Sequence, residues 1–238
     1  MRRLFIADVH ANLPAFEEVL RDVGPIDEVI FLGDIVGYGP HPAQCVELLQ
    51  RVGARAILGN HDVEIIETAP SPENPDEPVD WLHWTRRRLS EEHLNYLDNL
   101  TARIELDSSS GPITLIHHPP DAPYLHPKMP DAVLGRHCRK IDGQTVFFGH
   151  SHRAFDRVID GQRLVCIPPV GQPRDGDPRA GYALQTGEGL FFHRVEYDVE
   201  IVVADIRAIG LDRSFTDRWI EFVRTGYDEE WSREYRRS

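Results

Sequence analysis

Metal-ligating side chains occur at five places along this chain, and each place follows directly on a short apolar run. In chain order they are Asp8 with His10, Asp34, Asn60 with His61 and Asp62, His117, and His150 with His152. Carboxylate, imidazole and amide donors together suit Mn, Fe, Co, Ni or Zn better than Ca or Mg. No cysteine takes part. The sequence therefore indicates a transition-metal site assembled from distant parts of the chain.

Two of these groups are spaced so that both side chains can reach one ion. Residues two apart in extended chain point the same way, so Asp8 with His10, and His150 with His152, can each present two ligands to one side. Each signal has a commonplace alternative when taken alone. An aspartate after a glycine suits a turn, a lone asparagine a left-handed turn, and a lone histidine a half-buried core position. The metal interpretation depends on all five places together.

The first 60 residues predict a scaffold that brings such places together. Apolar runs that read as strands alternate with helical patterns, the first of which has Asn12 as N-cap and Pro14 in its first turn. In chain order we predict strand 4–7, helix 12–20, strand 29–32, helix 42–52 and strand 56–58. This alternation is typical of βαβ units in a partly parallel sheet. The carboxyl ends of its strands form one edge, where ligands bind.

The second half of the chain is richer in strands, and we expect antiparallel pairing there. Asp160-Gly161 and residues 186–189 are hairpin signals. The predicted strands are 113–116, 146–148, 155–159, 163–167, 182–185 and 190–197. The predicted helices are 80–88, 90–99 and 214–225, and 68–80 is predicted to be a surface loop. We expect residues 1–238 to form one α/β domain whose charged tail, 227–238, is frayed.

Composition limits the classes of partner. The 26 Lys and Arg residues against 39 Asp and Glu residues give a net charge of -13. That balance disfavours nucleic acid and anionic membrane as partners, because both are bound through basic surfaces. Three cysteines without a CxxC pair, and an N-terminal apolar run too short for a signal peptide or membrane helix, predict a soluble cytoplasmic protein.

The motif series resembles that of the calcineurin-like metallophosphoesterases, and it runs over most of the chain. A small bacterial and archaeal branch of that family is the closer resemblance, on three further runs. These are the run from Asp8 to Pro14, the run Leu32-Gly-Asp-Ile-Val-Gly-Tyr-Gly-Pro40, and Val170-Gly-Gln-Pro-Arg-Asp175. The resemblance implies an α/β fold of four layers (αββα), with two mixed sheets flanked by helices.

The resemblance also implies two divalent metal ions. One is held by Asp8, His10, Asp34 and His152, and the other by Asp34, Asn60, His117 and His150, so that Asp34 bridges them. His61 is implied to protonate the leaving oxygen or to stabilise its charge, and Asp62 to orient His61, with helix capping as the alternative. Two ions about 3.5–4 Å apart can share a hydroxide for in-line attack at phosphorus. We therefore predict hydrolysis of a small phosphodiester or phosphomonoester.

Each candidate substrate contact allows more than one role. His118 stands where the branch usually has glycine, and could contact substrate, narrow the pocket, replace His117 on the metal, or simply face solvent. Tyr38 could stack on a base or ring. Arg174 could contact a phosphate, or pair with a neighbouring aspartate. Pro168-Pro169 replaces a Gly-Ser element of the branch, which bears on the substrate more than on the metals.

Three alternatives to a small-ester hydrolase can be weighed. The stretch Val36–Gly39 lacks the Asp-Arg-Gly of the protein phosphatase branch, which disfavours a protein Ser/Thr phosphatase. The acidic balance disfavours a nuclease. A metal-binding or partner-binding scaffold without catalysis is disfavoured because every ligand position and His61 are present. The sequence does not predict the oligomeric state or the native metal.

Overall fold

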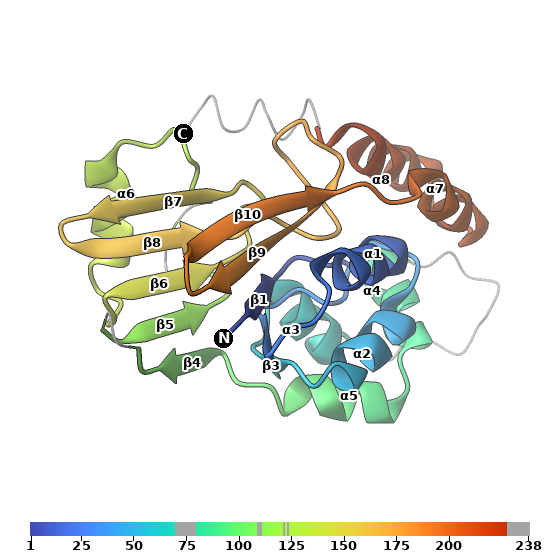
Figure 1. Cartoon of the computed structure of the whole chain (residues 1–238). Coiled ribbons are helices and arrows are strands. Elements are labelled where there is room, and N and C mark those ends of the chain that lie inside the picture. Colours follow the sequence, from blue (N-terminus) through green and yellow to red (C-terminus); the bar gives the residue numbers. More distant parts are fainter. Residues whose placement is uncertain (70–79, 109–110, 121, 123, 228–238) are drawn as a thin grey trace.

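The structure is a computed structural model that describes residues 1–69, 80–108, 111–120, 122 and 124–227. The expected surface loop at 68–80 and the expected frayed tail at 227–238 therefore lie mostly outside the described residues. The described residues form two five-stranded mixed sheets, as Figure 1 shows.

The first sheet carries the N-terminal βαβ units. Its strand order is β10 (Gly189–Val195), β9 (Ala180–Thr186), β1 (Arg3–Ile6), β2 (Glu28–Phe31) and β3 (Arg55–Ala56). β1, β2 and β3 are parallel, whereas β9 is antiparallel to both β1 and β10. The parallel arrangement expected for the first 60 residues is confirmed, so the ends of β1, β2 and β3 face one edge.

The expectation of antiparallel pairing in the second half is confirmed for the hairpin at residues 186–189, which joins β9 to β10, but the second sheet corrects it in part. Its order is β4 (Arg103–Leu106), β5 (Ile113–Ile116), β6 (Thr145–Phe148), β8 (Gln162–Cys166) and β7 (Phe155–Ile159). Only the β4–β5 and β7–β8 pairs are antiparallel; β5, β6 and β8 are parallel. The predicted Asp160-Gly161 hairpin joins β7 to β8. Because that hairpin reverses the chain again, β8 returns beside β6 in the same direction.

The helices of the described residues are mostly where the sequence places them. They are α1 (Leu13–Val23), α2 (Pro42–Arg51), α3 (Asn60–Glu67), α4 (Trp81–Arg88), α5 (Glu91–Asp98), α6 (Asp131–Cys138), α7 (Val199–Ala208) and α8 (Arg213–Thr225). The Asn12 cap is confirmed, since its side chain accepts a hydrogen bond from the amide of Ala15 at 3.2 Å. α3, α6, α7 and β4 were not predicted.

Three apolar clusters separate four layers. The first lies between the outer helices and the first sheet, the second between the two sheets, and the third between the second sheet and α6. β1 serves two of them: Leu4 and Ile6 face the helices, and Phe5 stacks on Phe147 of the other sheet with ring centroids 4.3 Å apart. The expected αββα arrangement is confirmed.

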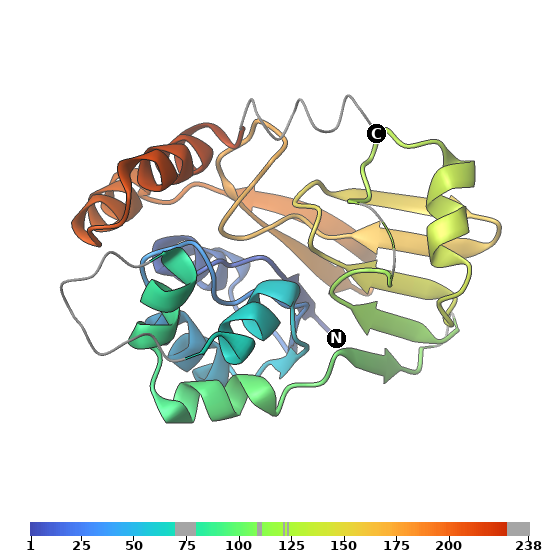
Figure 2. The ribbon, with the colours of Figure 1, turned by 180° about the vertical axis from the view of Figure 1, so that it is seen from behind.

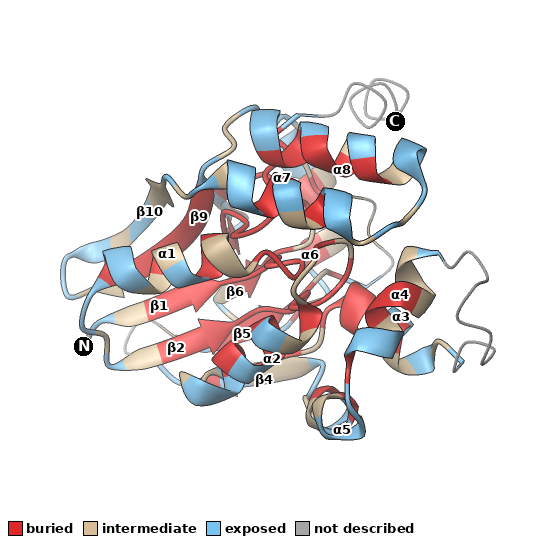
Figure 3. Cartoon of the chain, turned by 90° about the vertical axis from the view of Figure 1, so that its right-hand side faces the viewer, coloured by how far each residue is buried: buried red, intermediate tan, exposed pale blue. Residues whose placement is uncertain are grey.

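The last two helices return to the N-terminal half of the molecule. α7 packs against α1 and against α8, far from the second sheet and α6 (Figure 2). Figure 3 shows the same helices with a buried stripe turned inward and an exposed outer face. Val202, Ile206, Trp219 and Val223 form a cluster with the ring of Tyr38 from the loop after β2. None of the helices in the described part of the chain has the length and apolar character needed to span a bilayer.

Candidate metal centre

The loops that follow β1, β2 and β6 have a left-handed backbone at the positions that carry the predicted ligands. Asp8, His10, Asp34, His150 and His152 all have φ between 47° and 65°. Non-glycine residues adopt this region rarely and at a cost, and such residues gather at functional sites. The amides of Asp8 and His10 donate to the carbonyls of Gly33 and Asp34, both at 3.0 Å, which holds two of these loops side by side.

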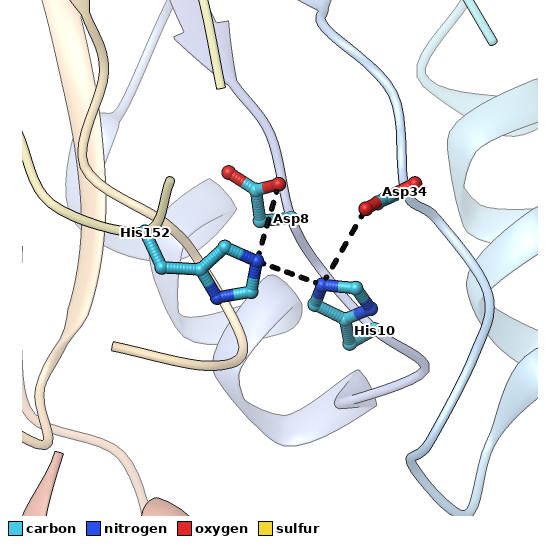
Figure 4. A group of neighbouring side chains, drawn as sticks. All are labelled: Asp8, His10, Asp34 and His152. Atoms are coloured by element: carbon cyan, nitrogen blue, oxygen red, sulfur yellow. Dashed lines mark hydrogen bonds and ion pairs between the residues drawn. The ribbon is translucent and has the colours of Figure 1, made fainter. Parts of the chain in front are cut away.

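Four of the predicted ligands form one buried group, shown in Figure 4. Asp8, His10, Asp34 and His152 place one ligand atom each within 4.8 Å of all the others. His152 Nε2 lies 3.5 Å from Asp8 Oδ1, and His10 Nε2 lies 3.7 Å from Asp34 Oδ2. They come from β1, β2 and β6, so the sheet edges bring together residues separated by more than 140 positions.

Asp34 also belongs to a second group. His117 Nε2 lies 3.1 Å from the same Oδ2 of Asp34, and His150 completes a set that could hold another ion. Asn60 joins this set through its side-chain oxygen, which lies 2.8 Å from His150 Nδ1 and 3.2 Å from His117 Nε2. The structure therefore brings all seven predicted ligand residues together, in two groups that share one carboxylate oxygen.

The hydrogen bonds around the histidines fit a bound cation. His117 Nδ1 donates to the carbonyl of Leu32 at 2.7 Å, and His152 Nδ1 donates to that of Gln172 at 2.5 Å. In the neutral rings both Nε2 atoms then carry a lone pair, which is how second partners prepare a histidine ligand. His152 Nε2 lies only 3.1 Å from His10 Nε2. Asp34 Oδ2 is buried with no hydrogen-bond partner among the described residues. These unmatched acceptors suit a divalent ion.

Electrostatics in the metal-free site point the same way. Burial raises the pKa of Asp8 to about 7, and the charge of Asp34 adds to the effect. Burial alone would also raise the pKa of Asp34, but the histidines around it outweigh burial and hold that pKa well below its usual range. Burial lowers the pKa of His10 and of His152, and it lowers that of His150 to about 2. These three rings are therefore neutral, the form that metal ions bind. His117 differs: burial would lower its pKa, but the charges of Asp34 and Asp8 raise it to about 9, so it must lose a proton when an ion binds.

Two glycines allow the strand ends to meet. A Cβ at Gly59 would overlap the Oδ1 atom and the main-chain nitrogen of Asp34. Gly33 has φ +94°, and a Cβ there would lie 2.7 Å from His117 Nδ1. Glycine at these two positions lets the Asp34 loop pack directly against the loop that begins α3.

His61 lies beside the first group. Its ring centroid is 5.1 Å from that of His10, and its main-chain amide donates to Asp34 Oδ1 at 2.9 Å. Its Nδ1 lies 2.9 Å from Oε2 of Glu64, one turn along α3. Glu64 was not among the residues singled out from the sequence, because no helix was predicted to begin at Asn60. Had a helix been predicted from Asn60, the three-residue spacing would have indicated this pair.

Asp62 contacts the main chain and is buried. Its Oδ2 accepts from the amides of Asp34 at 2.8 Å and Gly59 at 2.9 Å, and its Oδ1 accepts from those of Ile35 and Val36. The bond to Gly59 corresponds to the capping alternative raised from the sequence. The other three bonds tie the Asp34 loop to α3, so the contacts favour a positioning role over orientation of His61.

Tyr38 lies beside the candidate metal centre, and both tryptophan and histidine rings pack against its ring. It stacks on Trp81 and Trp219 with centroid distances of 4.7 and 5.2 Å, and its ring centroid is 4.6 Å from that of His61. Burial raises the pKa of Tyr38 far above its ordinary value. The ring is thus better placed to support His61 than to stack on a base.

Arg174 is only 3% exposed and lies close to the ligands. Its guanidinium donates to Gln172 Oε1 at 2.8 Å and lies over the rings of Tyr124 and Phe222. The two neighbouring aspartates pair elsewhere, Asp175 with Arg194 and Asp177 with Arg179. Its charge acts on Asp8 and on the ligand histidines. Of the two alternatives raised from the sequence, these contacts favour a phosphate contact for Arg174 over a pair with a neighbouring aspartate.

The two departures from the branch have different surroundings. His118 is half-buried, with its ring centroid 4.2 Å from that of His150, and it is His117 that belongs to the second donor group. Pro168 and Pro169 pack closely against Gly181 of β9. The amide of Gly171, just after them, donates to the carbonyl of Asp8 at 2.9 Å. The prolines therefore belong to the segment that supports the main chain of Asp8. His118, in contrast, contacts the second donor group through His150.

Comparison with known proteins agrees with this architecture. A family model, described as the calcineurin-like phosphoesterase superfamily domain, matches residues 1–189. An uncharacterized protein of Methanocaldococcus jannaschii is 31% identical over 226 residues, which is 82% of this chain and 87% of that protein. A symmetrical bis(5'-nucleosyl)-tetraphosphatase of Actinobacillus succinogenes is 25% identical over 117 residues, 40% of this chain and 42% of that one.

A solved structure extends the similarity to 95% of the chain. The crystal structure of a metallophosphoesterase from Sphaerobacter thermophilus has a TM-score of 0.80 and 34% sequence identity. The similarity covers 95% of this chain and 99% of that one, and so includes most of the region after residue 189. Since a family model matches most of the sequence and a relative of that class shares its fold throughout, the chain belongs to the calcineurin-like phosphoesterase superfamily.

Proposed function

We propose that this protein hydrolyses small phosphodiesters or phosphomonoesters with the help of two divalent transition-metal ions. The observation that carries the proposal is the shared Oδ2 atom of Asp34, which belongs to both donor groups. Asp8, His10 and His152 would hold one ion with Asp34, and Asn60, His117 and His150 the other. Mn, Fe, Co, Ni and Zn all suit these donors. Divalent ions held there acidify a water molecule and offset phosphate charge.

The residues of the chain supply orientation and a proton. His61 lies beside the first donor group, and its Nδ1 lies 2.9 Å from Oε2 of Glu64. This contact leaves Nε2 as the atom that gives a proton to the leaving oxygen. Asp62 holds the Asp34 loop through main-chain hydrogen bonds, so we assign Asp62 the role of a positioning residue. Arg174 supports the proposal as a buried positive charge near the ligands.

The acidic balance of the chain supports a small substrate. At -13 the protein repels long polyanions. Two divalent ions bring a charge of +4 against the -2 of Asp8 and Asp34, which leaves a local positive spot. A small ester can enter such a spot without facing the acidic surface along its whole length. The dinucleoside substrate implied by the name of the A. succinogenes relative is one member of this class.

The first experiment is a panel of p-nitrophenyl phosphate and bis-p-nitrophenyl phosphate, with Mn, Co, Ni, Zn or no added metal. We expect metal-dependent release of p-nitrophenol. Asp34→Asn should lower both the metal content and the rate, whereas the exposed Asp98→Asn should change neither. A protein that binds two ions per chain but hydrolyses none of the esters would favour a non-catalytic scaffold.

A second experiment isolates the role of His61. General acid catalysis contributes about 10²–10⁴-fold, and it matters most when the leaving group is a poor one. His61→Ala should therefore slow phenyl phosphate esters much more than p-nitrophenyl esters, with the metal content unchanged. An equal loss with both leaving groups would contradict the assignment of His61 as the acid.

A further inference from the structure

A cavity of about 540 Å³ lies beside the metal centre, on the outer face of the second sheet. It is open to solvent and is bordered by the start of β4, the end of β5 and the C-terminal end of α6. Ile116, Pro120 and Ile141 give it apolar walls, and Arg103, Arg136 and Lys140 reach it from two sides. Its volume is within the range of small-molecule sites, which is about 300–1,000 Å³.

The lining of this cavity is basic on an acidic protein. Three cationic side chains and two histidines line it, and no acidic residue does. Arg103 pairs with Glu105 at 2.8 Å and lies 3.9 Å from Asp142, so its charge is largely offset. Within the described residues, Arg136 and Lys140 have no ion-pair partner. The dipole of α6 accounts for cations near its C-terminal end, but not for Arg103, which approaches from β4. A cluster of this kind suits an anion, and arginine suits phosphate in particular.

His118 connects the cavity to the metal centre. It lines the cavity, and its ring centroid lies 4.2 Å from that of the proposed ligand His150. The proposed acid His61 contacts His10 and Tyr38 instead, on the side of the first donor group. The cavity therefore adjoins the second donor group, away from the residue that would meet the leaving oxygen.

We propose that this cavity binds a second, non-scissile phosphate on the part of the substrate that is retained after cleavage. The inference rests on the proposed hydrolase function and narrows its substrate class to esters with two phosphate groups. Arg136 and Lys140 bind the second phosphate, and the apolar walls accept the group that links the two phosphates.

Two matched chromogenic substrates test this directly. They are thymidine 5'-(p-nitrophenyl phosphate) and its counterpart with an added 3'-phosphate, so that they differ only in the distal phosphate. We expect the KM of the 3'-phosphorylated ester to be about tenfold lower, as one or two charge-assisted hydrogen bonds would give. The double variant Arg136→Gln/Lys140→Gln should bring the ratio of the two KM values toward one.

Arg139→Gln is the matched control, because Arg139 is an exposed cation at the same end of α6 that does not line the cavity. It should keep the wild-type KM ratio. A ratio near one in the wild-type protein, or an equal fall of the ratio in the control, would overturn the proposal. Circular dichroism and thermal melts establish that the variants fold.

Direct binding separates this inference from the hydrolase proposal. Calorimetry with thymidine 3',5'-bisphosphate and thymidine 5'-monophosphate, on metal-loaded protein, needs no turnover. Tighter binding of the bisphosphate that the double variant loses would support the cavity even if no ester is cleaved. Equal affinity for the two nucleotides would reject it, even if both chromogenic esters are hydrolysed.

Discussion

The carboxylate of Asp62 holds the main chain of Asp34, with its Oδ2 accepting from the Asp34 amide at 2.8 Å. We therefore expect Asp62→Asn to act through Asp34. An amide nitrogen placed among four main-chain donors cannot accept, so at least one of these bonds is lost and the Asp34 loop shifts. Loss of such an outer partner typically weakens metal binding by about 10–100-fold. Competition with a chelating indicator measures this change.

The control for Asp62→Asn is Asp98→Asn, which removes an exposed carboxylate at the end of α5. It should leave metal affinity unchanged. If Asp62→Asn lowers the rate while metal affinity stays at the wild-type value, Asp62 would act on His61 rather than on Asp34. That result would restore the orienting role implied by the family resemblance.

Glu64 provides a second prediction, through its contact with Nδ1 of His61 at 2.9 Å. Glu64 is about half exposed, so the pair should contribute only about 0.2–1 kcal/mol. Glu64→Gln should therefore lower kcat by about two- to fivefold and leave KM nearly unchanged. The loss should be larger for esters with poor leaving groups. Glu67→Gln, at the end of the same helix, is the control, and an equal loss in both variants would refute the orienting role of Glu64.

The residues proposed as metal ligands could be singled out from the sequence because each group of them follows a predicted strand. The parallel order of β1, β2 and β3 is a local consequence of βαβ units, so the meeting of Asp8 and Asp34 follows from chain order. Hydrophobic periodicity also located most helices. Among the elements that were not predicted, α6 has eight residues that include a glycine and show little periodicity.

The contacts of Tyr38 and Glu64 could not be predicted, for two different reasons. Glu64 required the start of α3 at Asn60, and the two-residue strand β3 gave no signal for a helix so soon after it. Tyr38 required the position of α8, which arrives about 180 residues later. Side-chain packing between such distant elements depends on tertiary structure that periodicity does not encode.

The metal affinity should rise with pH. In the metal-free protein, burial raises the pKa of Asp8 to about 7. Burial would lower the pKa of His117, but the charges of Asp34 and Asp8 raise it to about 9. Both groups must lose their proton to bind an ion. Affinity should thus rise about tenfold per pH unit between pH 7 and 9, and more steeply below pH 7.

Calorimetry in buffers of different ionisation enthalpy measures the protons released on metal binding. About two protons are expected at pH 6, and about one near pH 8. Metal affinity that does not change with pH, together with no proton release, would show that these two residues are not ligands.

Gly59 should tolerate no side chain. A Cβ there would overlap both the carboxylate and the main chain of Asp34, so rotation of one side chain cannot relieve the contact. Gly59→Ala should destabilise the fold by about 1–3 kcal/mol and weaken metal binding. Gly187→Ala is the control, because a Cβ at Gly187, in the β9–β10 hairpin, would meet nothing within 4 Å. Urea titrations of both metal-free variants measure the unfolding free energy, and metal titrations then measure the affinity. Equal stability and equal metal affinity in the two variants would contradict this prediction.

Trp219 joins α8 to the centre, since its ring stacks on Tyr38 and lies 6.5 Å from that of His10. It is 3% exposed, so Trp219→Ala should cost about 3–5 kcal/mol of unfolding free energy. Trp219→Phe should cost much less, because it keeps a ring against Tyr38 and removes a buried Nε1 that has no hydrogen-bond partner among the described residues. Phe192→Ala, at a partly exposed position of β10, is the control. Urea denaturation measures the unfolding free energy of the three variants. Equal losses for Trp219→Ala and Trp219→Phe would contradict the prediction, because they would mean that the indole makes a contact that stacking on Tyr38 and burial do not explain.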